Sequence, residues 1–227
     1  YTLSLHDALP IFIWDASGQC LFCARDAAGV KPFYYFYRPQ LFAFASEIKA
    51  LWAIPEISRR LNERKLADYL TWSFEDTQDT FYQNIHRLPP ASTLSVTVGD
   101  MQLRQYWMLN PQREIYLESD AAYVESFREI FNEAVRCRLS GVDPLGSTLS
   151  GGLDSSSIAC TARQLLAQSN NTPVKTFSAI FSIVEAEQWG EIDERFYIEE
   201  VLASGGFEAH YLDVSQLNPL FDPDKLY

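Results

Sequence analysis

The sequence lacks long apolar runs and has few basic side chains. No apolar run in its 227 residues approaches the roughly 18 residues of a membrane span, and no signal peptide pattern is present. Thirty acidic against 18 basic side chains give a formal charge of −12, whereas binding a phosphate backbone needs clustered Lys and Arg. Neither a membrane nor a nucleic acid is therefore expected as a partner, and the cytoplasm is the expected location.

Cysteine is also scarce. The four cysteines, at positions 20, 23, 137 and 160, do not suggest a disulfide framework, so reduced thiols are expected. Cys20 and Cys23 form a C-x-x-C, but structural zinc normally needs a second ligand pair, and the histidines at 6, 86 and 210 are scattered. Apolar thiols in a strand are favoured over a zinc site.

The first half of the chain is predicted to be antiparallel β-structure. A hydrophobic content of 47% supports at least one core, and the length suggests one to two domains. Between residues 12 and 44, short aromatic segments are separated by Gly18, Gly29 and Pro39, which predicts consecutive strands. Further on we predict helices over 46–52 and 62–72, a loop at 75–80, a hairpin of 93–98 with 102–107, and a linker over 108–120.

From residue 121 the pattern alternates between helix and strand. The expected elements are a helix over 123–139 with one buried face, a strand over 143–149, a helix over 155–167, a strand over 174–183 buried on both faces, a helix over 193–203 and a strand over 210–214. Strands that alternate with helices of this length predict a parallel, doubly wound sheet.

The segment TLSGGLDSSS, residues 148–157, lies where a predicted strand becomes a helix. Free N–H groups and the helix dipole favour an anion at such a point. Gly151 and Gly152 permit close approach of a ligand and positive φ, and Ser150, Ser155 and Ser156 add hydroxyl groups. A phosphate or pyrophosphate is the predicted ligand.

Two nucleotide-binding motifs do not fit this segment. A Walker loop requires a lysine, which is missing here, and the dinucleotide fingerprint requires a different glycine spacing. The remaining pattern is S-G-G-x-D-S. Its structural alternative is a plain turn in which Asp154 caps the following helix.

The hexapeptide Ser150–Ser155 resembles the pyrophosphate loop of ATP pyrophosphatases, which cleave ATP between its α- and β-phosphates. Other motifs narrow the resemblance to the asparagine synthetase family: R-D-x-x-G-x-K-P-F-Y-Y at 25–35, A-S-E-I-K-A at 45–50, L-P-P at 88–90, Y-W at 106–107 and D-E-R-F-Y-I-E-E-V at 193–201. The resemblance covers most of the chain from Phe12 to Val214.

The resemblance implies two domains. Residues 12–107 are expected to form the C-terminal part of an N-terminal-nucleophile glutaminase domain, which is antiparallel β-structure. Residues 121–227 are expected to form the first half of a doubly wound, parallel-sheet ATP pyrophosphatase domain. In the first domain we expect an ion pair between Arg25 and Asp26 and a positive φ at Gly29.

The resemblance also implies a reaction. Glutamine is hydrolysed at an amino-terminal cysteine, and the ammonia attacks a β-aspartyl adenylate made from ATP-Mg²⁺ and aspartate. The residues implied at the pyrophosphate are Ser150, Gly151, Gly152, Asp154 and Ser155, with Asp154 near magnesium and with Leu149 and Ala179 near adenosine. Ile180 stands where the family commonly has glycine. Neither Cys20 nor Cys23 has a free α-amine, so no catalytic residue is assigned in this chain.

The chain is expected to be a piece of a longer protein, because it starts without methionine and ends without an obvious closing element. Residues 1–11 fit poorly with the strand-forming segments after them and are expected to be a non-native leader. The polypeptide itself should bind ATP weakly and should not turn over. The alternatives are a β-lactam synthetase-like enzyme or lasso-peptide macrolactam cyclase of the same fold, or a scaffold without catalysis. A homodimer is left open.

Overall fold

The computed structural model describes residues 10–73, 75–139, 145–168, 172–180 and 194–214. The chain separates into two compact units, the first ending at Ile115 and the second beginning at Tyr116. Within the described ranges, no helix is long and apolar enough to cross a membrane.

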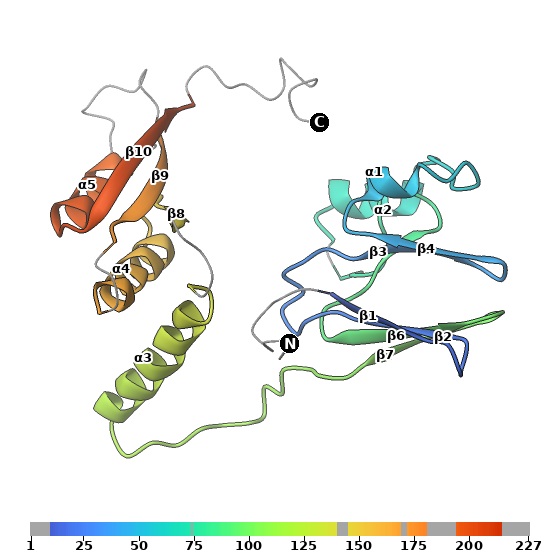
Figure 1. Ribbon diagram of the computed structural model, residues 1–227, viewed down its shortest axis with the longest axis horizontal. Coiled ribbons are helices and arrows are strands. Elements are labelled where there is room, and N and C mark those ends of the chain that lie inside the picture. The colour runs from blue at the N-terminus through green and yellow to red at the C-terminus, as the bar shows by residue number, and fades with distance from the viewer. Residues whose placement is uncertain (1–9, 74, 140–144, 169–171, 181–193, 215–227) are drawn as a thin grey trace. The chain divides into compact units, whose positions relative to one another are not determined.

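The first unit contains two antiparallel sheets (Figure 1). One has the strand order β1-β2-β6-β7, and its strands are β1 (Ile11–Asp15), β2 (Cys20–Ala24), β6 (Ser92–Thr97) and β7 (Asp100–Gln105). The other has the order β4-β3-β5, with β3 (Tyr34–Arg38), β4 (Leu41–Ala45) and β5 (Ile85–Arg87). The predicted aromatic strands and the hairpin are confirmed, whereas the three-residue β5 was not predicted.

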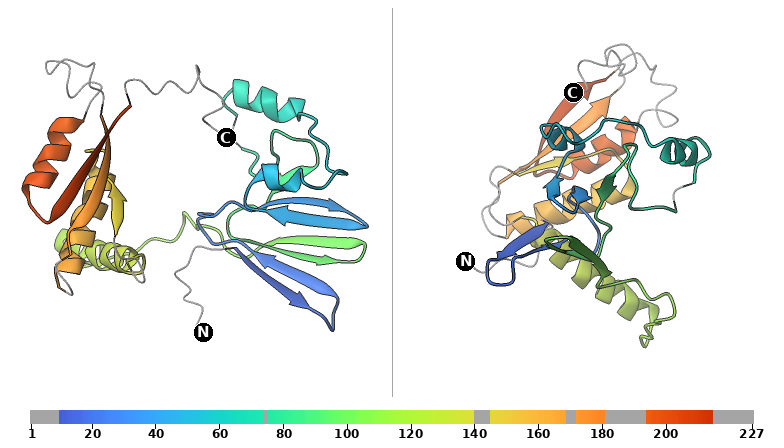
Figure 2. Two further views of the ribbon diagram at one scale, coloured as in Figure 1. Left: turned by 45° about the horizontal axis from the view of Figure 1, so that its top comes forward. Right: turned by 90° about the vertical axis from the view of Figure 1, so that its right-hand side faces the viewer.

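The core of the first unit lies on both faces of the β4-β3-β5 sheet. Successive side chains of β3 point to opposite faces of the sheet, so Tyr35 belongs to one cluster and Phe36 to the other. The first cluster lies between the two sheets (Figure 2) and contains Cys23, Phe33, Tyr35, Leu88, Leu94 and Val96. The second includes Leu51 of α1 (Ile48–Leu51). The other predicted helix is present as α2 (Glu63–Leu70), which has no buried residue.

The turn after β2 is held by a buried guanidinium group. Arg25 is 6% exposed and donates to three carbonyl oxygens, those of Lys31 at 2.9 Å, Leu88 at 2.6 Å and Gly29 at 2.5 Å. Burial lowers the pKa of Arg25. Asp26 instead accepts from the Val30 N–H at 3.1 Å, so the expected Arg25–Asp26 ion pair is wrong. The positive φ of Gly29 is confirmed, at 63°.

The second unit is built on a parallel sheet of strand order β10-β9-β8 (Figure 1). Its elements are α3 (Asp120–Arg136), β8 (Gly146–Thr148), α4 (Leu153–Ala167), β9 (Val174–Ile180), α5 (Arg195–Ala203) and β10 (Phe207–Asp213). Val174 of β9 packs with Ala162 of α4 and Val135 of α3, and Ala159 of α4 packs with Ile198 of α5. The predicted alternation of helices and parallel strands is confirmed.

The burial of β9 differs from the prediction. Val174, Thr176 and Ser178 are buried, but Phe177 between them is 50% exposed. The cause is that α4 packs against one face of the sheet, while the described residues leave Phe177 and Leu212 exposed on the other. The prediction that both faces of this strand are buried is therefore wrong for the described part of the unit.

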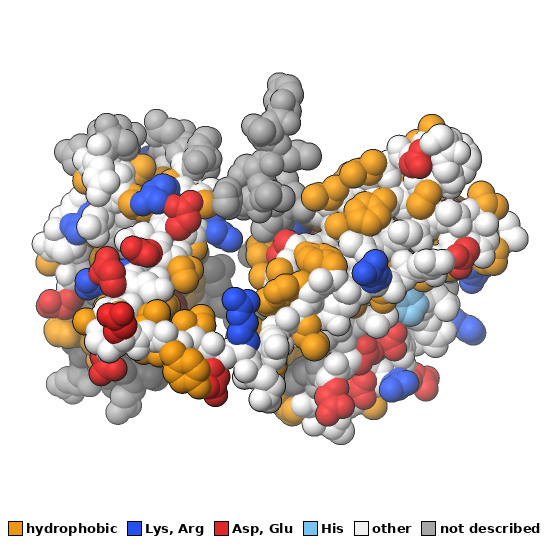
Figure 3. Space-filling view, turned by 90° about the horizontal axis from the view of Figure 1, so that it is seen from below, with side chains coloured by type: hydrophobic (Ala, Val, Ile, Leu, Met, Phe, Trp, Pro, Cys, Tyr) orange, Lys and Arg blue, Asp and Glu red, His pale blue; other side chains and the backbone are white. Residues whose placement is uncertain are grey.

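Helix α3 also departs from its prediction. It begins after Ser119, whose side chain accepts from the Ala122 N–H at 3.2 Å. Val135 near its end is buried, but Tyr123, Phe127 and Ile130 are exposed. The predicted buried face is thus realised only at the C-terminal end of the helix, where the sheet and α4 provide partners. Exposed apolar side chains occur in both units (Figure 3).

Candidate functional site

The candidate site is the turn between β8 and α4. Strand β8 ends at Thr148 and helix α4 begins at Leu153, so residues 149–152 form the connection. Leu149 is buried and donates its N–H to the Phe177 carbonyl at 3.0 Å, which keeps the start of the turn beside β9. The turn therefore lies at the carboxyl end of a parallel sheet, where ligands of α/β proteins commonly bind.

The two glycines of the turn have different environments. Gly151 has a φ of +91°, and a Cβ there would lie 2.7 Å from the Glu194 carbonyl oxygen and 3.3 Å from the Tyr197 Cβ. Gly152 has a φ of −67°, and the nearest atom to its Cβ would be the Ser150 Oγ at 3.6 Å. Positive φ is thus adopted by Gly151 alone, and the chain segment that approaches it closely is the start of α5.

The hydroxyl groups of Ser150 and Ser155 are bonded to each other. Their Oγ atoms are 2.9 Å apart, and the Ser155 Oγ also accepts from the Ser150 N–H at 3.1 Å. Ser155 donates to the Gly152 carbonyl at 3.2 Å. The Ser156 Oγ is buried and has no hydrogen-bond partner among the described residues. The Ser155 side chain therefore holds the turn in place through its hydrogen bonds to Ser150 and Gly152. The sequence did not predict this role for Ser155.

Asp154 is the second residue of α4 and is exposed. The N-cap of this helix is Gly152, and no side chain caps it, so the alternative in which Asp154 is the N-cap is wrong. A carboxylate in the first turn is favoured by the helix dipole. Asp154 lines a groove of about 870 Å³ between α3 and α4, where Arg128 and Asn132 lie opposite.

A second hollow, of about 570 Å³, lies beside the turn and contains three of the predicted residues: Leu149, Ser150 and Ala179. His210 also lines it, with its ring stacked on Phe177 at a centroid distance of 5.0 Å. The structure thus places Leu149, Ser150 and Ala179 together and Asp154 in the neighbouring groove. Gly151 and Gly152 lie in the turn that connects them, and Ser155 lies in the first turn of α4.

Ser178 and Tyr211 also line this hollow and were not predicted from the sequence. The Ser178 hydroxyl donates to the Leu149 carbonyl at 2.7 Å. The Tyr211 hydroxyl donates to Glu199 at 2.5 Å, and burial together with this bond raises the pKa of Tyr211 to about 12. Both contacts join residues distant in sequence, so no local pattern indicates them.

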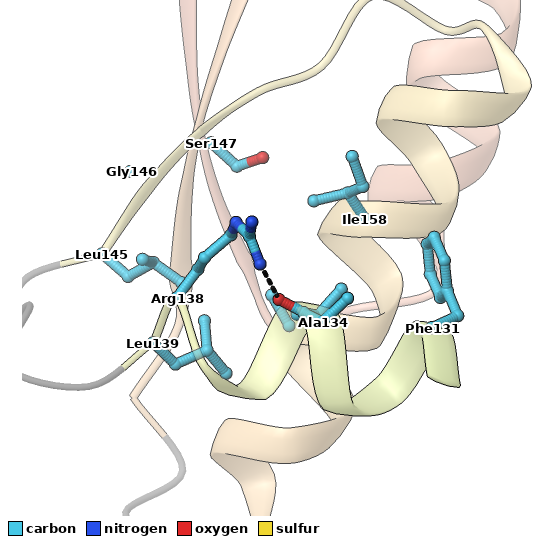
Figure 4. Close-up of a pocket in the computed structure, with 10 residues that line it drawn as sticks. Phe131, Ala134, Arg138, Leu139, Leu145, Gly146, Ser147 and Ile158 are labelled. Carbon is cyan, nitrogen blue, oxygen red and sulfur yellow. Dashed lines mark hydrogen bonds between the residues drawn. The ribbon is translucent and has the colours of Figure 1, made fainter. Parts of the chain in front are cut away.

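A third hollow, of about 360 Å³, lies between α3, β8 and α4 (Figure 4). Its walls include Phe131, Leu139 and Ile158, and the Arg138 guanidinium donates to the Ala134 carbonyl at 2.7 Å. It contains none of the predicted site residues and is not part of the candidate site.

The described residues contain no group of three or more His, Cys, Asp or Glu side chains that could hold a metal ion. All four cysteines lie among the described residues, where none is joined in a disulfide. His210 lies 3.0 Å from a carboxylate oxygen of Glu208, so it is a paired surface histidine.

The comparisons with known proteins match both parts of the chain. Residues 4–107 match a family described as a glutamine amidotransferase domain, and residues 126–220 match a family described as asparagine synthase. The chain is therefore a protein with a glutamine amidotransferase domain followed by the start of an asparagine synthase domain. The first match begins inside residues 1–11, whose non-native origin stays a prediction.

Curated relatives match nearly the whole chain. Glutamine-hydrolyzing asparagine synthetase 3 of Bacillus subtilis is 31% identical over 209 residues, which are 90% of this chain and 34% of the relative. A putative glutamine-hydrolyzing asparagine synthetase 2 of Methanocaldococcus jannaschii is 32% identical, over 84% of this chain and 35% of the relative. The chain belongs to the asparagine synthetase family. It spans about a third of the length of these relatives.

Two further relatives have a different name, amidase. Amidase chyE of Penicillium rubens is 32% identical over 181 residues, covering 74% of this chain and 26% of the relative.

Proposed function

We propose that the protein makes asparagine in an ATP-dependent reaction with glutamine as the nitrogen donor. Aspartate is activated as β-aspartyl-AMP with release of pyrophosphate, and ammonia from glutamine, or free ammonia, then displaces AMP. The observation that carries this proposal is the S-G-G-L-D-S turn at the carboxyl end of β8, which leads into α4 within the matched asparagine synthase region.

The turn suits a pyrophosphate group for two reasons. The first N–H groups of α4 have no partners within the helix, and the positive end of the helix dipole lies at the same place. Gly152 presents the backbone without a Cβ, and among the described residues outside its own stretch of backbone only the Ser150 Oγ lies within 4 Å of the position that a Cβ would take. In the proposal, Ser150, Gly151, Gly152 and Ser155 shape the loop that holds the phosphates.

Magnesium is proposed to bind together with ATP. Mg²⁺ is usually held by one or two carboxylates with substrate phosphates and water, rather than by a cage of protein ligands. Asp154 fits this requirement, because it is an exposed carboxylate in the first turn of α4 and the described residues hold no larger ligand cluster. When bound, the ion would offset the negative charge of the phosphates.

Adenosine is proposed to occupy the hollow beside Leu149 and Ala179. Its volume of about 570 Å³ lies within the usual range of about 300–1,000 Å³ for small-molecule sites. The Phe177 side chain supplies an exposed apolar ring on the same surface. In this proposal adenosine lies on the Leu149 side of Ser150 and the phosphates lie on the Gly151 side, in the order in which these residues follow one another along the turn.

Several predictions about the whole protein belong to this proposal. The polypeptide of 227 residues is proposed to be inactive by itself, because no catalytic residue of either reaction is assigned in it. The proposed location is the cytoplasm, where ATP is available and free thiols such as these four persist. A homodimer stays a prediction.

The test uses the protein translated from the complete reading frame that encodes this chain. Pyrophosphate release from ATP is measured with aspartate and either glutamine or ammonia. The proposal expects release that requires both aspartate and a nitrogen donor, and expects Asp154→Ala to abolish it while Glu125→Ala, in the same groove, does not. Release with neither substrate, or no release, would overturn the proposed function.

A further inference from the structure

The peptide group between Leu149 and Ser150 is held from both sides by serine hydroxyls. Its carbonyl oxygen accepts from the Ser178 Oγ of β9 at 2.7 Å. Its N–H donates to the Ser155 Oγ of α4 at 3.1 Å. This peptide group follows the Thr148–Leu149 group, whose N–H still bonds to β9, so its orientation sets the direction in which the turn leaves the sheet.

The Ser178 bond lies at the point where strand pairing ends. The Leu149 N–H still bonds to β9, through the Phe177 carbonyl at 3.0 Å. The Leu149 carbonyl then accepts from a side chain of β9, and both residues are buried, Leu149 at 1% and Ser178 at 4% exposure. A buried carbonyl that loses its partner is costly, because no water replaces the bond. The hydroxyl therefore lets the backbone leave β9 without an unpaired carbonyl.

We propose that Ser178 is a positioning residue for the ATP site, and this inference rests on the proposed function. Ser178 sets the orientation of the 149–150 peptide, and through it the position of Ser150 and the following glycines. It acts through the backbone of the turn, because its hydroxyl already donates to Leu149. Loss of this hydroxyl loosens the loop that holds the phosphates and weakens binding of ATP.

Thr176 provides a matched control on the same strand. It lies two residues before Ser178, on the same buried face of β9, and is 0% exposed. Its hydroxyl has no hydrogen-bond partner among the described residues. Replacing Thr176 by Val removes a buried hydroxyl from the same strand without touching the turn, so it separates a general effect on the core from the specific bond to Leu149.

The kinetic test compares three variants of the complete protein in the pyrophosphate-release assay. Ser178→Ala is expected to raise KM for ATP by about three- to tenfold, the effect of about one lost hydrogen bond, with a smaller change in kcat. Ser178→Thr keeps a hydroxyl and is expected to restore KM, and Thr176→Val is expected to leave it unchanged. Equal KM for Ser178→Ala and wild type, or an equal rise in Thr176→Val, overturns the proposal.

A second measurement does not depend on activity. Amide hydrogen exchange over residues 149–156, without nucleotide, is expected to be faster in Ser178→Ala than in wild type, Ser178→Thr or Thr176→Val. If wild type releases no pyrophosphate, the proposed function fails, and the exchange rates still decide whether Ser178 holds the turn. Unchanged exchange in Ser178→Ala overturns the holding role even if the enzyme is active.

Discussion

The two units each contain a turn at a glycine with positive φ, and the two turns use their polar groups differently. At Gly29 the Arg25 guanidinium is buried and bonded to three carbonyl oxygens. At Gly151 the turn is bonded through Ser155 and Ser178, yet Gly152 has room beside it and Asp154 is exposed. The first turn is complete without a ligand, whereas the second leaves the start of a helix open to one.

The two turns illustrate two roles that a sequence motif of a family can have: one stabilises the fold and the other binds a ligand. The R-D-x-x-G-x-K-P and S-G-G-L-D-S motifs both resemble the family, but the arginine of the first stabilises the fold of the first unit. The S-G-G-L-D-S motif combines one structural glycine with one open glycine. Substitutions at both turns can therefore test which residues serve the fold and which serve the ligand.

The largest effect on stability is expected for Gly151→Ala. An alanine would need a φ of +91° and would place its Cβ 2.7 Å from the Glu194 carbonyl oxygen. The strain and the clash together should cost about 2–5 kcal/mol of unfolding free energy. Urea unfolding of the protein measures this cost.

Gly152→Ala is the matched control for this substitution. Its φ of −67° and the 3.6 Å distance to the nearest atom allow a methyl group. We expect a change below about 1 kcal/mol in stability. Equal loss of stability in the two variants would contradict the assignment of Gly151 as the structural glycine of the pair.

The next largest effect is expected for Arg25→Ala. The substitution leaves the carbonyls of Gly29, Lys31 and Leu88 without their donor, and should destabilise the first unit by about 2–4 kcal/mol. Arg25→Lys should recover little, because an ammonium group lacks the planar set of donors. Unfolding in urea tests both, with the exposed Arg104→Ala as control. A loss of stability no greater than that of Arg104→Ala would show that Arg25 does not hold this turn.

The rate at which the cysteine thiols react should differ between the two units, because the two thiols compared differ in burial. Burial raises the pKa of Cys23, in the core of the first unit, to about 12. At pH 8 its thiolate should be on the order of a thousandfold less abundant than that of an ordinary thiol. Alkylation mapped by mass spectrometry should thus be much slower at Cys23 than at the half-buried Cys160 of α4, and equal for both in urea. Equal native rates would contradict the burial of Cys23.

The smallest effect is expected from Tyr211 and only at high pH. Its pKa is raised to about 12 by burial and by its bond to Glu199, whereas an unfolded tyrosine titrates near pH 10. The unfolded state loses its proton first, so this contribution to stability is complete below about pH 10 and is lost between about pH 10 and 12. Tyr211→Phe should reduce the slope of stability against pH in this window. An unchanged slope would contradict the raised pKa.

The elements could be predicted largely from the sequence. Short aromatic segments separated by glycine or proline identified β1 to β4, and helical spacing identified α2 and α3, because these patterns are local. The short β5 was missed because three residues carry no usable period. The burial of Phe177 and Phe127 was misjudged, because which face is covered depends on packing between distant elements.

The site could be predicted only in part. The position of the turn and of Leu149, Ser150 and Ala179 around one hollow follows from strand ends in a parallel sheet. The different conformations of Gly151 and Gly152 depend on how α5 approaches, and the Ser178 bond depends on strand register. No short sequence pattern contains either relation.

The most direct test of the account is exchange of labelled pyrophosphate into ATP by the complete protein, with aspartate present and no nitrogen donor. Reversible formation of an aspartyl adenylate predicts exchange that requires aspartate, is lost in Asp154→Ala and persists in Arg104→Ala. Exchange that ignores aspartate, or none in the wild-type protein, would contradict the proposal that the turn after β8 holds the phosphates of ATP.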